Sequence, residues 1–370
     1  MLDIGTKADD YALTKLYKYM LNNQMCGGCC GEIEVDFSNH KDGFNASYLI
    51  KSAQFYEYKL SHSPDKACES FFGYNSVLPG AYCMFRWKAI QGGPMDKFFK
   101  LVNSNADPTC PEANEYLAED RVMCLQIYIK EKAGYYLTFI PDAKAFTDAP
   151  ENLTILIKQR RRWMNGALFA AFRVIQNCQN MTRCKRTKHS MCRQALMFVY
   201  MLYFITMQVL TFFLLGSFFV SIKLFFKNYF KQITDKETFK INNYDMWYFF
   251  NGDGSLTFVS IFSYLYIGML VVSLLVSITM PVDRAIYYFR FVATVMCILT
   301  IISLIGISVF LSDSGFYPQT KIYDSTNMIW YNAPNDEHHF SVLTLCGMIM
   351  LAIFLLPMLM RPLDFIENFP

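Results

Sequence analysis

The distribution of apolar residues divides the chain into two unlike parts. Residues 1–180 contain no long apolar run, whereas the second part contains four. Each of these runs reaches the roughly 20 residues that a helix needs to cross the hydrocarbon core of a bilayer. This pattern predicts a soluble domain followed by an α-helical transmembrane bundle with about four spans over residues 194–361. The runs lie at Gln194–Ile222, Leu256–Met280, Ile286–Leu311 and Phe340–Met360.

Shorter patterns in the first part alternate between helical and strand periods. "YALTKLYKYML" and "SYLIKSAQFYEYKLS" have helical spacing, and "EYLAEDRVMCLQIYIKEKAG" predicts a helix that ends at Gly134. "CCGEIEVDF" and "YYLTFIPDAKAF" predict strands, and "SVLPGAYCMFRWKAI" predicts two strands around a Pro-Gly interruption. Alternating strands and helices indicate an α/β domain with a mostly parallel sheet over residues 1–150. A long amphipathic helix at the membrane interface is predicted over residues 151–180.

Composition and charge narrow the class of protein. Hydrophobic residues make up 53% of the 370 residues and charged residues 18%, which is too apolar for a purely soluble protein. The net charge of +3 does not indicate a nucleic-acid partner, and no RNA-binding or glycine-loop signature is present. Basic residues cluster over 183–193, so the positive-inside rule places the soluble part in the cytosol. The lysine-rich loop 223–255 disagrees with this topology, which would put it outside.

The cysteine-rich stretch "CGGCC" contains Cys26, Cys29 and Cys30. A structural zinc site would need a second pair of ligands at suitable spacing, and none follows. We therefore favour reduced cytosolic thiols that pack as small hydrophobic side chains.

Two acidic features are candidates for chemistry. Glu119 and Asp120 are predicted to begin a helix, where the positive end of the helix dipole keeps a carboxylate ionised. An ionised aspartate at a strand–helix junction can act as a general base, although a lone acidic pair at this position is more often a helix cap. Asp3 is predicted at the carboxyl end of a strand, where open α/β sheets bind ligands, but a lone aspartate there is also a common turn residue.

The stretch "QRRRW" places Gln159, Arg162 and Trp163 on neighbouring positions of one helix surface. Arginine offers two parallel hydrogen bonds to phosphate oxygens, and an indole offers a flat face to a sugar ring. The alternative is an interfacial helix with snorkelling arginines and an anchoring tryptophan. The stretch alone leaves both interpretations open.

The order of these motifs resembles that of a known family. An aspartate at a strand end, then "CCGEI", "SVLPGA", "LAEDR" and "QRRRW", then apolar spans, resembles chitin synthase over about residues 1–175. The wider group of processive inverting glycosyltransferases shares the QxxRW pattern, whereas "LPGA" and "CGEI" favour chitin synthase. A partial glycosyltransferase domain is therefore the expected fold of the soluble part.

The resemblance implies a role for each matching residue. Asp3 would bind a divalent metal, Mg²⁺ or Mn²⁺, with Gly5 two positions on. Asp120 would be the catalytic base, with Glu119 beside it. The remaining matches concern substrates: Gln159, Arg162 and Trp163 would hold the acceptor end and the donor diphosphate, Leu78, Pro79 and Gly80 would line the acceptor side, and Cys30, Gly31 and Glu32 would belong to the donor-sugar region.

The function implied is transfer of N-acetylglucosamine from UDP-N-acetylglucosamine to a growing β-1,4-linked chitin chain, with export across the plasma membrane by a multi-pass protein. Expected partners are this donor, the nascent chain, membrane lipid and a further copy of the chain in a homo-oligomer. The chain begins at the metal-site strand and has no "SWGTKG" motif, so we expect an internal piece without the uridine-binding portion. The alternatives are a synthase of another β-linked polysaccharide and an inactive membrane fragment.

Overall fold

A computed structural model describes residues 1–38, 45–102, 109–183, 187–236, 253–313, 321–324 and 329–332. The chain divides into two compact units, the first formed by Met1–Thr211 and the second starting at Phe212. The first unit contains every residue that the sequence nominates for chemistry.

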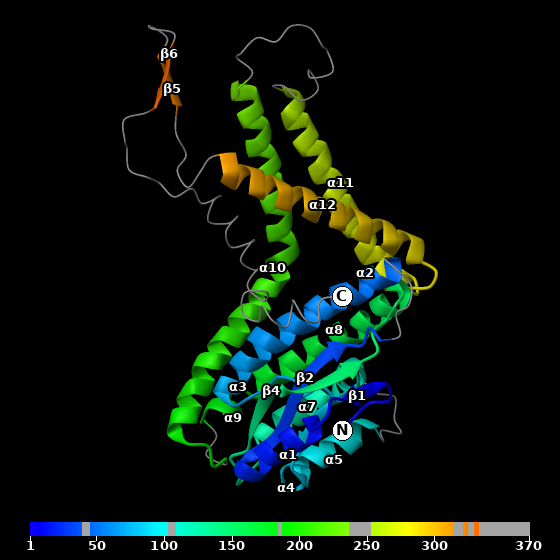
Figure 1. The fold of residues 1–370 in the computed structure, drawn as a ribbon, viewed down its shortest axis with the longest axis vertical. Coiled ribbons are helices and arrows are strands. Elements are labelled where there is room, and N and C mark those ends of the chain that lie inside the picture. The colour runs from blue at the N-terminus through cyan, green and yellow to red at the C-terminus, as the bar shows by residue number, and fades with distance from the viewer. Residues whose placement is uncertain are drawn as a thin grey trace. The chain divides into compact units, whose positions relative to one another are not determined.

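A four-stranded sheet forms the centre of the first unit, in the order β1-β4-β2-β3 (Figure 1). Only β2 and β4 run parallel; β1 pairs antiparallel with β4, and β3 pairs antiparallel with β2. The prediction of a mostly parallel sheet is therefore wrong, and the sheet is mixed. The strands are β1 Thr6–Ala8, β2 Cys26–Val35, β3 Cys83–Phe85 and β4 Tyr136–Thr147.

Apolar side chains fill both faces of the long β2–β4 pair. Helix α1 (Ala12–Asn22) covers one face, where Leu16 packs in a cluster with Cys29 and Ile33. On the other face Cys30 packs in a cluster with Leu137 and with residues of α7 and α10. Cys26, Cys29 and Cys30 are buried free thiols, as the sequence predicted. Cys29 and Cys30 pack on opposite faces of the sheet because side chains alternate along a strand.

Gly31 lies where β2 and β4 approach most closely, at a shift in their register. A Cβ atom added at Gly31 would overlap the carbonyl oxygen of Ala143 and the ring of Tyr82. The glycine of the "CGE" stretch is therefore needed for backbone packing.

Three helical segments follow one another between β2 and β3. They are α2 (Ala46–Leu60), the π-helix η1 (Ser61–Lys66), which contains Pro64, and α3 (Ala67–Phe72). The segment that contains Leu78 is irregular, so the prediction of a strand before the Pro-Gly pair is wrong. Proline lacks the N–H that a ladder needs, and only β3 forms after it. Two helices follow β3, namely α4 (Trp87–Ile90) and α5 (Gly93–Val102).

Two helices occupy the stretch for which one was predicted. Helix α6 spans Cys110–Tyr116 and α7 spans Glu119–Tyr128, so the single helix ending at Gly134 is wrong at both ends. The break at Leu117–Ala118 starts a new helix at the acidic pair. The long helix is confirmed as α8 (Leu153–Gln176), which is followed by α9 (Cys178–Arg183).

Long apolar helices follow the domain. They are α10 (Met191–Lys236), α11 (Asp253–Thr279) and α12 (Ile286–Asp313), and a short hairpin of β5 (Lys321–Asp324) and β6 (Ile329–Asn332) comes next. Within the described residues, Met191–Phe213 and Ser260–Thr279 are long and apolar enough to cross a membrane, and Ile286–Ile301 is a shorter apolar helix. Three predicted runs thus coincide with helices, and Phe340–Met360 lies outside the described residues.

Candidate functional site

The acidic pair begins α7, as predicted, and α8 packs directly against its start. The N-cap residue is Ala118, which has no side-chain capping bond, so the interpretation of the pair as a cap is wrong. A Cβ atom added at Gly166 would lie 2.9 Å from Cβ of Ala118 and 3.1 Å from the carbonyl of Leu117. The missing side chain at Gly166 therefore lets the helix that carries "QRRRW" approach the acidic pair.

Burial dominates the electrostatics of both carboxyl groups. Burial raises the pKa of Asp120. Two smaller effects lower it: the charge of Arg121, and the backbone N–H of Arg121, which donates to Asp120 Oδ1 at 2.7 Å. Burial also raises the pKa of Glu119, and the neighbouring Asp120 charge adds to this. The helix dipole was expected to act the other way, but desolvation outweighs it. A carboxylate with a raised pKa is a stronger base, which suits proton abstraction.

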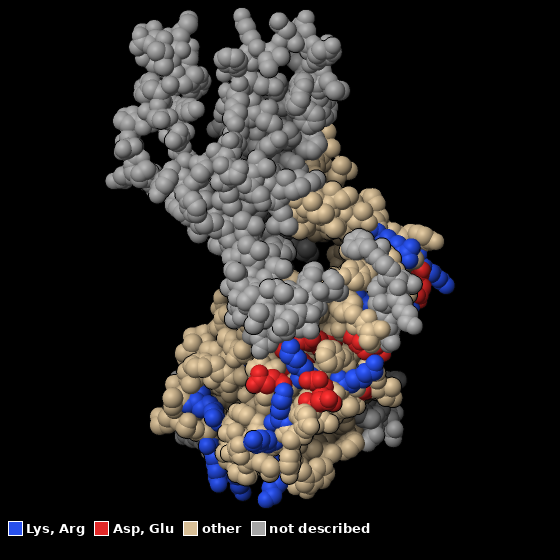
Figure 2. Space-filling view, viewed as in Figure 1, with Lys and Arg blue, Asp and Glu red and all other residues tan. Residues whose placement is uncertain are grey.

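Predicted residues from distant parts of the sequence meet around this pair. The charges of Arg162 and Asp3 both affect the pKa of Glu119, with Arg162 lowering it and Asp3 raising it. The backbone of Gly80 hydrogen-bonds Asp120 and lowers its pKa. Figure 2 shows acidic and basic side chains gathered on one face of the first unit. The structure thus bonds Gly80 to Asp120 and places Asp3 and Arg162 within electrostatic range of Glu119.

The N-terminal residues are attached to the "LPGA" segment. The N–H of Asp3 donates to the carbonyl oxygen of Ala81 at 3.1 Å, and Leu2 forms an isolated antiparallel bridge with Tyr82. Asp3 therefore follows a single bridge and precedes β1, rather than ending a regular strand. Its side chain is exposed. This attachment places the exposed Asp3 one residue from Gly80 and hence close to Asp120.

The "LPGA" segment is held by hydrogen bonds to α7 and to Tyr82, and it leaves open space at Gly80. The N–H of Leu78 donates to Cys124 Sγ of α7 at 3.2 Å, and the carbonyl oxygen of Pro79 accepts from the N–H of Tyr82 at 3.1 Å. A Cβ atom added at Gly80 would meet nothing within 4 Å. Gly80 thus leaves open space beside Asp120, which is consistent with a place for an acceptor.

Cys30 and Glu32 lie inside the domain. Burial raises the pKa of the Cys30 thiol. Glu32 is fully buried, and Lys59 Nζ bridges it and Glu34, at 2.9 Å from Glu32 Oε1 and 2.7 Å from Glu34 Oε1. In this structure the two residues support the sheet beneath the acidic pair, and neither is presented to solvent.

The three residues of the QxxRW pattern differ in exposure along α8. Arg162 and Trp163 are exposed, and the indole of Trp163 retains 38% of its surface. Gln159 is half-buried, and its Oε1 has no hydrogen-bond partner among the described residues. An unsatisfied acceptor of this kind is costly to bury, so Gln159 is suited to receive a donor from a ligand.

Two residues that the sequence did not nominate also belong here. The buried Lys66, at the end of the π-helix, donates to the carbonyl oxygen of Val77 at 3.0 Å, and its charge lowers the pKa of Asp120. Arg160 lies over the Trp163 ring, with Cζ 4.4 Å from the ring centroid. Lys66 has no local signal, because it acts on Asp120 across the fold, whereas the three-residue spacing of Arg160 and Trp163 on one helix is a local signal that could have found Arg160. The π-helix is the one structural hint, since such irregular turns are frequent at functional sites.

A base with a raised pKa, an exposed arginine, an exposed aromatic ring and an open backbone segment suit transfer of a sugar from an anionic leaving group. This combination defines the class as a glycosyltransferase domain. Residues 1–178 match the family model of the chitin synthase-like glycosyltransferase domain.

Three curated relatives are similar to the chain over its first part. Chitin synthase 2 of Mycosarcoma maydis is 41% identical over 176 residues, which cover 46% of this chain and 16% of the relative. Chitin synthase 1 of Fusarium oxysporum is 34% identical over 234 residues, covering 60% and 25% respectively. Chitin synthase 1 of Phytophthora sojae is 35% identical over 223 residues, covering 60% and 24%. The matched region thus spans about a quarter or less of the length of these relatives.

Proposed function

We propose that this chain forms part of a membrane-bound chitin synthase, which transfers N-acetylglucosamine from UDP-N-acetylglucosamine to a growing β-1,4-linked chain. The observation that carries the proposal is the hydrogen bond of the Gly80 backbone to Asp120, together with the electrostatic effect of Arg162 on the neighbouring Glu119. The family model matched by residues 1–178 and the names of the relatives support the choice of polymer.

Each residue has a physical role in this reaction. Asp120 accepts the proton of the acceptor hydroxyl, which is a poor nucleophile until a base withdraws that proton. Arg162 stabilises the negative charge that develops on the leaving diphosphate. Attack from the face opposite the diphosphate inverts the anomeric carbon and produces the β-linkage. Trp163 supplies a flat apolar surface for a sugar of the acceptor.

Asp3 is the proposed protein ligand of a divalent metal, Mg²⁺ or Mn²⁺. Among the described residues, no three His, Cys, Asp or Glu side chains come together as a metal site. One exposed carboxylate nevertheless fits Mg²⁺, which commonly binds one or two carboxylates and takes its other ligands from water and substrate phosphates. When bound, the ion would neutralise charge on the diphosphate.

The apolar helices are the proposed membrane part, through which the polar polymer leaves the cell. Two described helices meet the length and hydropathy required, and the basic residues near α10 favour a cytosolic catalytic domain. Location in the plasma membrane, multiple spans and a homo-oligomer are parts of the same proposal.

A sugar-nucleotide panel tests the proposed reaction. Membranes from cells that express the gene for this chain are supplied with UDP-N-acetylglucosamine, UDP-glucose and UDP-glucuronic acid, and polymer is measured before and after chitinase digestion. We expect chitinase-sensitive polymer from the first donor alone. Polymer from another donor would favour a different β-linked polysaccharide, and absence of polymer would favour a non-catalytic fragment.

The Asp120→Asn variant supplies the control, because it preserves shape and removes the proton acceptor. Loss of a general base costs on the order of 100- to 10,000-fold in rate. Retention of more than about a tenth of the wild-type rate would reject Asp120 as the base, and Glu119 would be tested next.

A further inference from the structure

The side chain of Arg160 lies between two aromatic rings. Its Cζ is 4.4 Å from the ring centroid of Trp163 on the same helix and 6.0 Å from that of Tyr58 on α2. A guanidinium within about 6 Å of an aromatic centroid is attracted by the ring quadrupole. Arg160 and Trp163 are three positions apart on α8, a spacing that places side chains on one helix face.

Helix α2 holds Arg160 in this position. Arg160 Nη2 lies 2.6 Å from Glu57 Oε2, and the Arg160 side chain is only 19% exposed. The charge of Arg160 also lowers the pKa of the Tyr58 hydroxyl, against the larger raising effect of burial. One guanidinium thus contacts a carboxylate, a tyrosine and the indole, which restricts the directions it can take.

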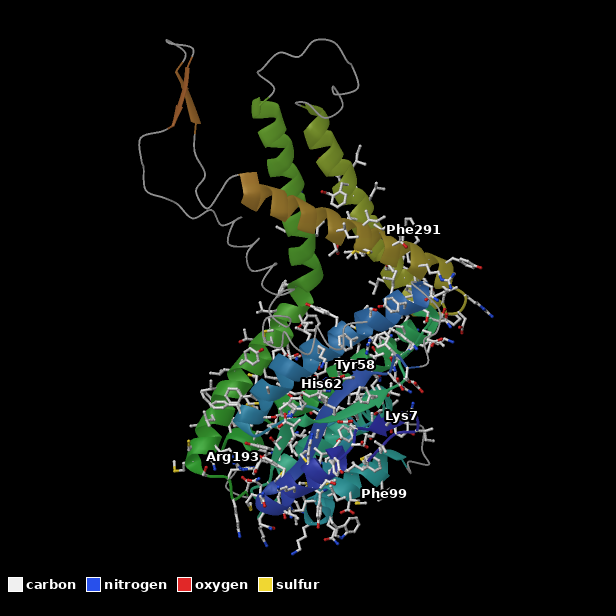
Figure 3. All side chains as sticks on the ribbon, in the orientation of Figure 1. Lys7, Tyr58, His62, Phe99, Arg193 and Phe291 are labelled. Carbon is white, nitrogen blue, oxygen red and sulfur yellow. The ribbon has the colours of Figure 1, made fainter. Side chains whose placement is uncertain are left out.

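The anchor on α2 is itself attached to the sheet. Lys59, next to Tyr58, is buried between Glu32 and Glu34 of β2. One turn further, His62 Nδ1 lies 2.7 Å from the carbonyl oxygen of Tyr58. Figure 3 shows Tyr58 on α2 and His62 on the π-helix η1 that follows it. The position of Arg160 is therefore set by the core of the domain through α2.

We propose that Arg160 is a positioning residue that covers one face of the Trp163 indole and presents the other face to a sugar ring of the acceptor. This inference rests on the proposed function. A side chain already fixed before binding loses less conformational entropy when the ligand arrives, so the contact strengthens acceptor binding. Two arginines of "QRRRW" then have separate roles: Arg160 orients the tryptophan, and the charge of Arg162 acts at Glu119.

Arg161 provides a matched control. It has the same charge, lies between Arg160 and Arg162 on the same helix, and is exposed. Substitution of Arg161 changes the net charge of the motif as much as substitution of Arg160 does. Any difference between the two variants therefore reports the packing of Arg160 on the ring.

The first experiment measures the contact itself. In the whole chain, Trp87, Trp247 and Trp330 are replaced by Phe, so that fluorescence reports Trp163 alone. We expect Arg160→Ala to increase acrylamide quenching and lower the fluorescence anisotropy, Arg160→Lys to have an intermediate effect, and Arg161→Ala to match the parent. Lysine keeps the charge but lacks the planar guanidinium. Equal quenching of the Arg160→Ala variant and the parent would overturn the proposal.

The second experiment measures acceptor binding, with chitotetraose as the probe and Trp163 emission as the signal. Loss of an exposed cation–π contact of about 0.5–1 kcal/mol corresponds to roughly 2- to 5-fold weaker binding. We expect this loss in Arg160→Ala, a smaller loss in Glu57→Gln and none in Arg161→Ala. If Arg160→Ala does not keep the parent circular dichroism spectrum, Arg160→Lys and Glu57→Gln decide the question.

Different outcomes would reject acceptor binding by this chain and the positioning role of Arg160. If the parent chain binds no chitotetraose, the acceptor assignment in the proposed function is rejected, and the role of Arg160 falls with it. If the parent binds and both arginine variants bind equally well, the proposed function stands and only the positioning role of Arg160 is rejected.

Discussion

Gly166 of α8 lies against Ala118, the residue that immediately precedes the acidic pair. A Cβ atom at Gly166 would approach Cβ of Ala118 to 2.9 Å, closer than real Cβ atoms come. The contact links the helix that carries "QRRRW" to the helix that carries the proposed base. The distance between the two groups of proposed site residues therefore depends on the absence of one side chain.

Replacing Gly166 by Ala tests this dependence. In an unobstructed helix the change would stabilise the protein by about 1 kcal/mol, because glycine is a poor helix former. Here we expect the opposite sign, a lower free energy of unfolding, together with reduced polymer formation. Chemical denaturation and the polymer assay measure the two effects. An increase in stability with normal polymer formation would show that α8 is not limited by this contact.

The pH dependence of polymer formation tests the electrostatics of Asp120. Because the pKa of Asp120 is raised, the rate of polymer formation should fall as the pH drops. The midpoint of this fall should lie above the ordinary aspartate pKa of about 3.9. The charge of Arg121 lowers this pKa. Arg121→Gln should therefore move the acid limb of the rate profile to higher pH, whereas the exposed Arg161→Gln should not. A shift to lower pH would contradict the assignment.

Gly31→Ala should disrupt the domain, because the added methyl group would overlap the backbone of β4. Overpacking a core typically costs 1–3 kcal/mol, and a clash with backbone belongs at or above about 3 kcal/mol. Gly93→Ala is the control, since a Cβ atom there meets nothing within 4 Å. We expect that change to stay within about 0.5 kcal/mol. Equal free energies of unfolding for the two variants would disprove the close approach at Gly31.

Lys59→Met should be strongly destabilising, because it leaves Glu32 and Glu34 buried without the lysine. Breaking a buried ion pair by removing one partner costs about 3–5 kcal/mol. The matched variant is Lys7→Met, since Lys7 pairs with Asp36 at 3.0 Å but its side chain is 65% exposed. An exposed pair contributes little to stability, because solvent screens it. Unfolding free energies that differ by less than about 1 kcal/mol would contradict the buried network.

His62 should make the fold sensitive to acid. Burial, with the charge of Lys66, lowers its pKa to about 3. Its stabilising contribution is present in full above the unfolded pKa of about 6.5, and it is lost progressively as the pH falls toward 3. Between pH 7 and pH 5 the wild type should lose about 2 kcal/mol more than His62→Asn, whose amide can still donate to the Tyr58 carbonyl. Parallel losses in denaturation at the two pH values would show that His62 is accessible to protons.

Local patterns predicted those features that depend on neighbouring residues. The helices α1, α2 and α8, the strands β2 and β4 and the start of α7 at the acidic pair all follow from periodicity and motif order. The cysteines were correctly interpreted as buried thiols, because no second set of ligands accompanies them. The break at Leu117–Ala118 was missed, since its apolar spacing is compatible with one continuous helix.

The sequence by itself determined the likeness of the first 178 residues to the chitin synthase-like glycosyltransferase domain, the two-part apolar pattern and the nomination of Asp3, Asp120 and the QxxRW residues. Only the tertiary structure decided the mixed sheet, the burial of Glu32, the raised pKa values of the acidic pair and the stacking of Arg160 on Trp163. Periodicity and motifs record what each segment prefers on its own. Strand direction, desolvation and side-chain stacking depend on which distant segment packs beside it, and that is set by the folded chain as a whole.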